Sequence, residues 1–99
     1  FGQSVQGTLT LDAGAVRAVQ GQGKSLLPAG ITAVEGTFGI GACVCLADAS
    51  GKDLARALVN FSSEDVRRIM GRRTSEIEAV LGHKDYDEVV HRDNLVLLT

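Results

Sequence analysis

The sequence predicts one small α+β domain in which short strands form a barrel-like arrangement. Its 99 residues are enough for a single domain with a modest core. Stretches in which apolar and polar residues alternate recur between glycine-rich turns, and only a few short segments have the helical period. Apolar residues make up 44% of the chain and aromatic residues only 4%, so the core must be mainly aliphatic. Many short strands around few short helices favour this fold class.

The first elements are a strand and a helix. Residues 1–6 have no pattern and begin without methionine, so we interpret them as the remnant of a linker before a domain over 7–99. Residues 8–11 alternate polar and apolar side chains, which predicts a half-buried strand. Asp12 can cap a helix that ends at Gly21 or Gly23. The apolar stripe of this helix is Ala15, Val16 and Val19.

Residues 23–31, GKSLLPAGI, predict a rigid loop that brings backbone groups close to another surface. The glycines relax steric limits and Pro28 fixes one φ angle. If Gly30 has a positive φ, a β-branched residue is strongly disfavoured there. The run Gly-Lys-Ser resembles the end of a phosphate-binding P-loop, but Ala18 stands where that motif requires glycine, so we do not predict a nucleotide site.

Three strands are predicted next, over 31–35, 42–47 and 54–61. Glycines around Phe38 and the 48–51 turn separate them. On the third of these strands one face carries Ala55, Ala57, Val59 and Phe61.

Two short helices and a last strand complete the order. Ser62 with Asp65, and Ser75 with Glu78, have the spacing of helix-capping pairs. Gly82 is placed to end the second helix. The last strand is predicted over 89–98, with a bend near 92–94.

The two cysteines, Cys43 and Cys45, lie two positions apart on a predicted strand. They share a face and are too close along the chain for an unstrained mutual disulfide. Only His83 and His91 remain to complete a zinc site, so we predict buried, reduced thiols, no metal site, and a reducing cytoplasm as the compartment. The net charge of −2 argues against indiscriminate binding to nucleic acid or membrane, and no apolar run approaches the roughly 20 residues of a membrane span.

No catalytic residues are predicted. His91-Arg92-Asp93 has the letters of a kinase catalytic loop but lacks its asparagine, because Leu98 stands there. We expect His91 to hydrogen-bond a neighbour. A secondary basic patch is matched by acids, since residues 64–78 sum to zero charge, which favours surface ion pairs over nucleic-acid binding. Its members are Arg67, Arg68, Arg72 and Arg73.

Six runs in this order resemble the C-terminal PUA domain of bacterial glutamate 5-kinases, over essentially everything from Gly7 to about Leu97. Phe61 departs from the pattern, since tyrosine is common there. The runs are residues 12–17, 23–31, 33–36, 58–63, 75–82 and 90–94.

The resemblance implies a PUA-like pseudobarrel of about five to six mostly antiparallel strands. It also implies a parent enzyme that uses ATP and Mg²⁺ to phosphorylate L-glutamate in the first step of proline synthesis and that is inhibited by proline. That chemistry belongs to a kinase domain outside this chain, so we expect no cofactor and no catalysis in the fragment. The expected partners are the kinase domain of the same chain and other subunits of a homo-oligomer.

In PUA domains that bind RNA, a groove lies between the first helix, the loop after it and the last strand. By resemblance, this predicted groove takes an RNA or protein partner. Two functions stay open, a regulatory or assembly module and an RNA-binding module; a strongly positive groove would favour RNA, and an apolar or mixed groove a protein partner. The groove residues carried over are Gly23, Lys24, Ser25, Leu26, Leu27, Pro28, Gly30, His91, Arg92 and Asn94.

Overall fold

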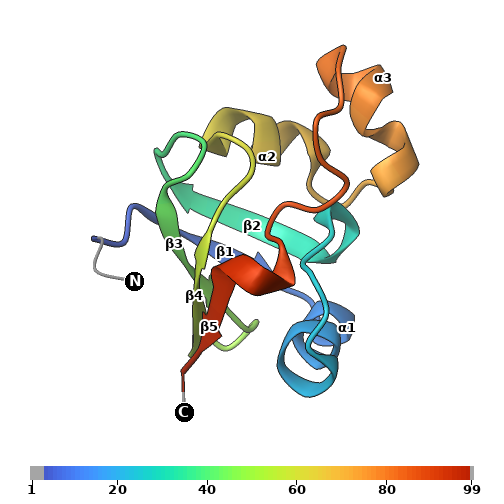
Figure 1. Ribbon diagram of the computed structural model, residues 1–99. Helices are drawn as coiled ribbons and strands as arrows, with labels where there is room; N and C mark the ends of the chain where they lie inside the picture. Colours follow the sequence, from blue (N-terminus) through green and yellow to red (C-terminus); the bar gives the residue numbers. More distant parts are fainter. Residues whose placement is uncertain (1–3, 99) are drawn as a thin grey trace.

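The computed structural model describes residues 4–98, which form a mixed sheet with short helices around it (Figure 1). The sheet order is β2-β1-β3-β4-β5, with β1 and β3 parallel and the other neighbours antiparallel. This confirms the predicted α+β class with mostly antiparallel strands. Within the described residues, the strands are β1 (Gly7–Leu11), β2 (Ile31–Gly36), β3 (Cys43–Ala47), β4 (Asp53–Leu58) and β5 (Leu95–Leu97), and the helices are α1 (Ala13–Val16), α2 (Ser63–Ile69) and α3 (Ile77–Leu81).

The centre of the fold is β3, every residue of which is buried. Val44 and Leu46 point into the main core, while the alternating period places Cys43 and Cys45 on the opposite face. The core is aliphatic, as the composition predicts. Its fully buried large side chains are Leu9, Leu11, Leu26, Ile31, Leu46, Ile69, Ile77, Val19, Val44, Val59, Val66 and Val89.

Two of the predicted helix caps are confirmed. The Ala15 N–H donates to Asp12 Oδ1 at 2.8 Å, and α1 continues as a π-helical turn, Arg17–Gly21. The Asp65 N–H donates to Ser62 Oγ at 3.2 Å at the start of α2. These side chains accept from backbone N–H groups that the helix itself leaves without partners.

The predicted cap of the last helix is wrong. Ser75 and Glu78 do not pair; instead a 3-10 turn, Thr74–Glu76, precedes α3, and the Arg73 N–H donates to Glu76 Oε1 at 3.1 Å. The helix therefore starts its hydrogen bonding two residues earlier than the serine predicts. Its end is confirmed, because Gly82 has φ 86° and its N–H donates to the Glu78 carbonyl.

The predicted strand over 89–98 is divided in two at the bend that the sequence predicts near 92–94. Val90 bridges to Leu26, and a 3-10 turn, Arg92–Asn94, separates this bridge from β5. The strand predicted over 54–61 ends at Leu58, although Val59 and Phe61 stay buried. In both places the chain leaves the sheet but keeps its core contacts.

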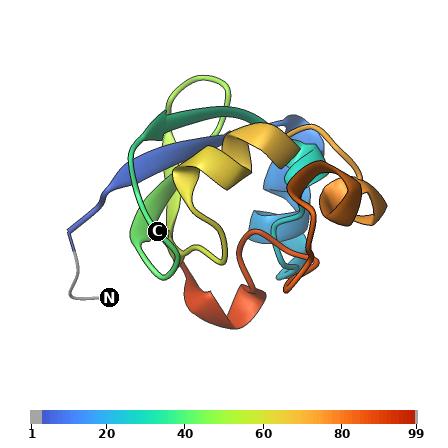
Figure 2. The same cartoon turned by 90° about the horizontal axis from the view of Figure 1, so that it is seen from above.

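The loop between β2 and β3 and the helix α1 lie at opposite ends of the fold. β1 begins beside the loop that joins β2 to β3 and ends at α1, so these two regions lie at opposite ends of one strand (Figure 1). α2 packs against β2 and α3, as the view from above shows (Figure 2). Among residues 4–98 we find no helix that has the length and apolar character to cross a membrane.

Candidate partner-binding groove

Backbone hydrogen bonds fix the proline loop on both sides. The Leu26 N–H donates to the Val90 carbonyl at 2.9 Å, and the Val89 N–H donates to the Leu26 carbonyl at 2.8 Å. The Pro28 carbonyl accepts from the Gly71 N–H at 2.8 Å, which ties the loop to the end of α2. A loop held this way presents a preformed surface rather than a mobile one.

Gly30 is required by close packing, not by a positive φ. Within the loop, Gly23 has the positive φ, at 62°, and Gly30 does not. A Cβ built on Gly30 would come within 3.0 Å of the Ala15 Cβ, and the Gly30 carbonyl accepts from the Asp12 N–H at 2.9 Å. The backbone of the loop at Gly30 therefore packs directly against the side chain of Ala15 in α1, which leaves no room for a methyl group on residue 30.

A groove of about 500 Å³ lies between this loop and α1, and we call it the α1 groove. Lys24, Ser25, Leu26, Leu27 and Gly30 of the predicted groove line it. The remaining lining residues were not predicted. They are Asp12, Gly14, Ala15, Ala18, Val19 and Ala29. Small residues three and four apart on the first helix were the signal for Gly14, Ala15 and Ala18.

The other predicted groove residues lie beside the α1 groove rather than along it. Pro28 is buried, and Gly23 precedes the lining segment. His91, Arg92 and Asn94 belong to the turn before β5, which Ser25 holds against the loop because Ser25 Oγ accepts from the Arg92 N–H at 2.9 Å. As expected, His91 bonds a neighbour, since its Nδ1 accepts from the Asp93 N–H at 3.1 Å.

The charge of the α1 groove is mixed. Among the described residues that line it, Lys24 is the one cation and Asp12 the one anion, and the others are apolar or small. Leu27 is 48% exposed, which is high for a leucine. The groove can therefore hold an apolar side chain flanked by one charge of each sign, and it lacks the dense positive field that phosphate backbones attract.

The basic patch on and after α2 is largely used within the domain. Arg67 donates to the Gly36 carbonyl at 2.7 Å, and Arg68 donates to the Val80 carbonyl. Arg68 and Arg72 also form exposed ion pairs, at 4.0 Å with Asp65 and at 3.4 Å with Glu76. Exposed pairs of this kind add little stability, whereas the bonds of Arg67 and Arg68 to carbonyl groups connect α2 to β2 and α3.

The cysteines are free and buried, as predicted. Burial, with a hydrogen bond to Asp53 as the next cause, raises the pKa of the Cys45 thiol to about 11, although Arg56 Nη1 lies 3.2 Å from its sulfur. The neutral thiol is therefore the stable form at neutral pH. In the part of the chain that the structure describes, no group of three or more metal-ligating side chains comes together.

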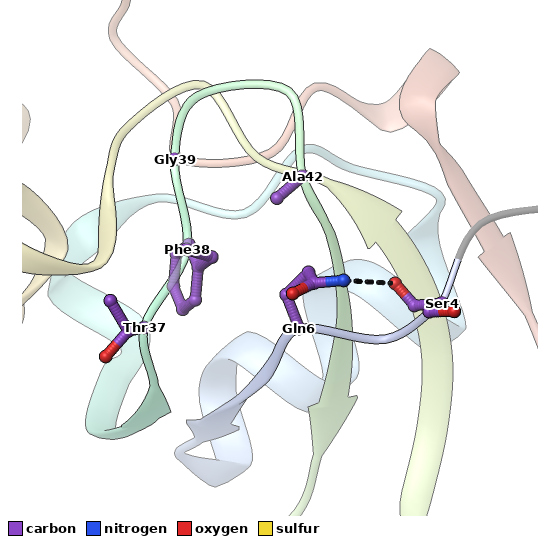
Figure 3. A pocket seen from close by; sticks show the side chains of 6 residues that line it. All are labelled: Ser4, Gln6, Thr37, Phe38, Gly39 and Ala42. Atoms are coloured by element: carbon purple, nitrogen blue, oxygen red, sulfur yellow. Dashed lines mark hydrogen bonds between the residues drawn. The ribbon is translucent and has the colours of Figure 1, made fainter.

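A second hollow, of about 690 Å³, lies at the opposite end of β1, and we call it the Phe38 hollow (Figure 3). Figure 3 shows Phe38, Gln6 and Ala42 gathered around it, between the entering chain and the loop that joins β2 to β3. No pattern in the sequence predicts this hollow. Its lining residues are Ser4, Gln6, Thr37, Phe38, Gly39 and Ala42.

Comparison with known proteins gives close relatives for nearly the whole chain. It is 57% identical over 98 residues to a glutamate 5-kinase of Synechococcus sp. (strain JA-2-3B'a(2-13)), covering 99% of this chain and 26% of the relative. It is 51% identical over 98 residues to glutamate 5-kinase of Moorella thermoacetica, with the same coverage. For glutamate 5-kinase of Syntrophus aciditrophicus the identity is 56% over 93 residues, covering 94% of this chain and 24% of the relative. The chain thus spans about a quarter of these curated relatives, at their C-terminal end.

Solved structures share the fold at low sequence identity. A PUA domain from Aeropyrum pernix K1, solved as a tartrate complex, has a TM-score of 0.64 and 19% identity, covering 88% of this chain and 41% of that one. A conserved PUA domain protein from Thermoplasma acidophilum has a TM-score of 0.57 and 19% identity, covering 63% and 40%. Residues 7–81 match the PUA domain family, and the chain belongs to that family.

Proposed function

We propose that this chain is an accessory PUA module of a glutamate 5-kinase, in which it tunes the activity, feedback regulation or assembly of the kinase domain. The observation that carries the proposal is 51–57% identity to the C-terminal part of glutamate 5-kinases over nearly the whole chain. Identity at this level over nearly the whole chain supports a shared role in the parent enzyme. The partners in this proposal are the kinase domain of the same chain and other subunits of a homo-oligomer.

The geometry of the α1 groove supports a protein partner. Its lining is apolar or small, and the single charges of Lys24 and Asp12 offset each other. A rigid groove with an exposed Leu27 at its edge suits an apolar side chain from another part of the enzyme. RNA binding is the alternative, and the exposed Lys24 and Arg92 are the cations that it would use.

ATP, Mg²⁺ and glutamate belong, in this proposal, to the kinase domain. The described residues of this chain do not fit a metal-nucleotide site, because they bring no three metal-ligating side chains together and the loop at Lys24 lacks the glycine of a P-loop. We also propose that the parent enzyme works in the cytoplasm, where reducing conditions keep thiols such as Cys43 and Cys45 free.

The experiment that tests the proposal changes Lys24 and Arg92 together to alanine. In the full-length enzyme we expect altered kinase activity or proline inhibition, and in the isolated domain we expect RNA binding near background with or without the change. Lys52→Ala with Arg73→Ala, which removes two exposed cations outside the groove, is the matched control. Submicromolar RNA affinity at physiological salt that is lost in the groove variant alone would replace the proposal with the RNA-binding function.

A further inference from the structure

Ile40 stands out on the surface of the described residues. It is 72% exposed, whereas the other exposed large apolar side chains range from 39% to 50%. It lies at the tip of the loop joining β2 to β3, between Gly39 and Gly41, and we call residues 39–41 the Ile40 turn. Burial of this side chain against another surface would remove its apolar area from water, which is favourable.

The Ile40 turn is held rigidly. The Gly41 N–H donates to the Val59 carbonyl at 2.8 Å, and the Ala42 N–H donates to the Gly39 carbonyl at 3.2 Å. Gly41 has φ 84°, a conformation that other residues rarely adopt. The exposure of Ile40 is thus built into the backbone.

The base of the same loop is also fixed. Ser63, a buried residue at the start of α2, accepts from the Phe38 N–H at 3.1 Å through its Oγ, and the Ser63 N–H donates to the Phe38 carbonyl at 2.9 Å. The loop therefore presents Ile40 without the entropy cost of ordering a mobile segment.

The Ile40 turn adjoins the Phe38 hollow, where the chain enters the domain. Gly39 lines the hollow together with Ser4 and Gln6 (Figure 3). The Gln6 N–H donates to the Cys43 carbonyl at 2.8 Å, which joins the entering chain to β3. Val5, which lies between Ser4 and Gln6 in the sequence, has 42% of its surface exposed. In the glutamate 5-kinase relatives, most of the chain precedes the segment that matches this one. In a longer chain of this kind, the preceding domain is connected at the end where residues 4–6 enter the fold, whereas the α1 groove lies at the far end of β1.

We propose that the Ile40 turn and the Phe38 hollow form the surface on which the preceding domain of the same chain docks. This inference rests on the proposed function, since it takes the chain to be the C-terminal module of a longer enzyme. Ile40 inserts into an apolar pocket of that domain, and the Phe38 hollow receives one of its side chains. The covalent connection raises the effective concentration of the two surfaces, so a contact of ordinary interdomain size suffices.

The test places a photoreactive benzoylphenylalanine at residue 40 of the full-length enzyme and identifies crosslinked peptides by mass spectrometry. We expect crosslinks within one chain, to the domain before residue 1, at least tenfold above those from the same group at Val96, an apolar residue of β5 that is 50% exposed. Crosslinks between two chains, or a yield equal to that from Val96, would overturn the inference.

A second variant checks the energetics without disturbing the fold. Ile40→Asp changes a side chain that contacts solvent, so the domain should melt as the unchanged domain does. In the full-length enzyme it should shift the docked-to-undocked ratio about tenfold or more toward undocked, seen as a larger radius in X-ray scattering, and Val96→Asp should not. An unchanged radius in both variants counts against docking.

The outcome for docking is separate from the outcome for the proposed function. If removing the module changes kinase regulation while residue 40 gives no intrachain crosslink, the proposed function stands and this inference fails. If residue 40 crosslinks to the preceding domain while removal of the module changes nothing, docking stands and the regulatory role fails.

Discussion

Replacing Gly30 with alanine should destabilise the domain through a steric overlap that the structure locates. The new Cβ would lie under 3.0 Å from the Ala15 Cβ, whereas carbon atoms in contact prefer about 3.5–4.0 Å. Neither atom can turn away, because both are fixed to backbone that the Asp12–Gly30 hydrogen bond holds together. Overpacking of this kind costs about 1–3 kcal/mol, so a value near 2 kcal/mol lowers Tm by roughly 8–16 °C in a domain of this size.

Thermal and urea unfolding measure this effect, and two further variants make it specific. Gly21→Ala is the control, since a Cβ there meets no atom within 4 Å and φ is not positive; its stability should be unchanged or slightly higher. Ala15→Gly removes the overlapping partner, so the double variant Gly30→Ala with Ala15→Gly should be more stable than the sum of the single changes predicts. Strict additivity, or a Gly30→Ala variant that melts with the unchanged protein, would refute the packing argument.

The remaining predictions concern the buried groups and the missing chemistry. Ser63→Ala should cost about 1–3 kcal/mol in urea unfolding, because it leaves the Phe38 N–H without its 3.1 Å side-chain acceptor, while Ser75→Ala, at an exposed serine that caps nothing, should cost under about 0.5 kcal/mol. The pKa of Cys45 is raised from a usual 9.0 to about 11, so the stability that the neutral thiol contributes is complete below pH 9 and is lost as the pH rises toward 11. Urea unfolding across this range should show a loss of about 2 kcal/mol in the free energy of unfolding that Cys45→Ala lacks. The same pH dependence of stability in both proteins would contradict this. The 99-residue chain with ATP, Mg²⁺ and glutamate should form no glutamyl phosphate, and turnover above a heat-killed control would contradict the assignment of catalysis to the preceding domain.

Much of the fold is predictable from local pattern. Asp12 and Ser62 show their capping roles in sequence because a cap depends on the next few residues alone. The alternation of Ala55, Ala57, Val59 and Phe61 likewise marks a buried face correctly, although β4 ends at Leu58. A side chain can stay in the core after its backbone has left the sheet, so burial patterns overrun strand ends.

Contacts between segments far apart in the sequence could not be predicted from local patterns. The turn at Arg92–Asn94 interrupts the predicted last strand because His91 caps it and Ser25 bonds it from far along the chain. The Phe38 hollow joins the entering chain to a later loop, so no local motif marks it. Gly30 was identified as constrained, but the reason, its approach to Ala15, depends on how two elements pack.

In the proposed function, this PUA module tunes a glutamate 5-kinase without performing its chemistry. This is tested by comparing the full-length enzyme with one truncated just before Gly7, assayed side by side for glutamate phosphorylation, proline inhibition and oligomeric state. We expect the truncated enzyme still to phosphorylate glutamate but to differ in its proline response or its assembly. A truncated enzyme that matches the full-length protein in all three assays, or one whose kinase domain is folded yet catalytically dead, would contradict it.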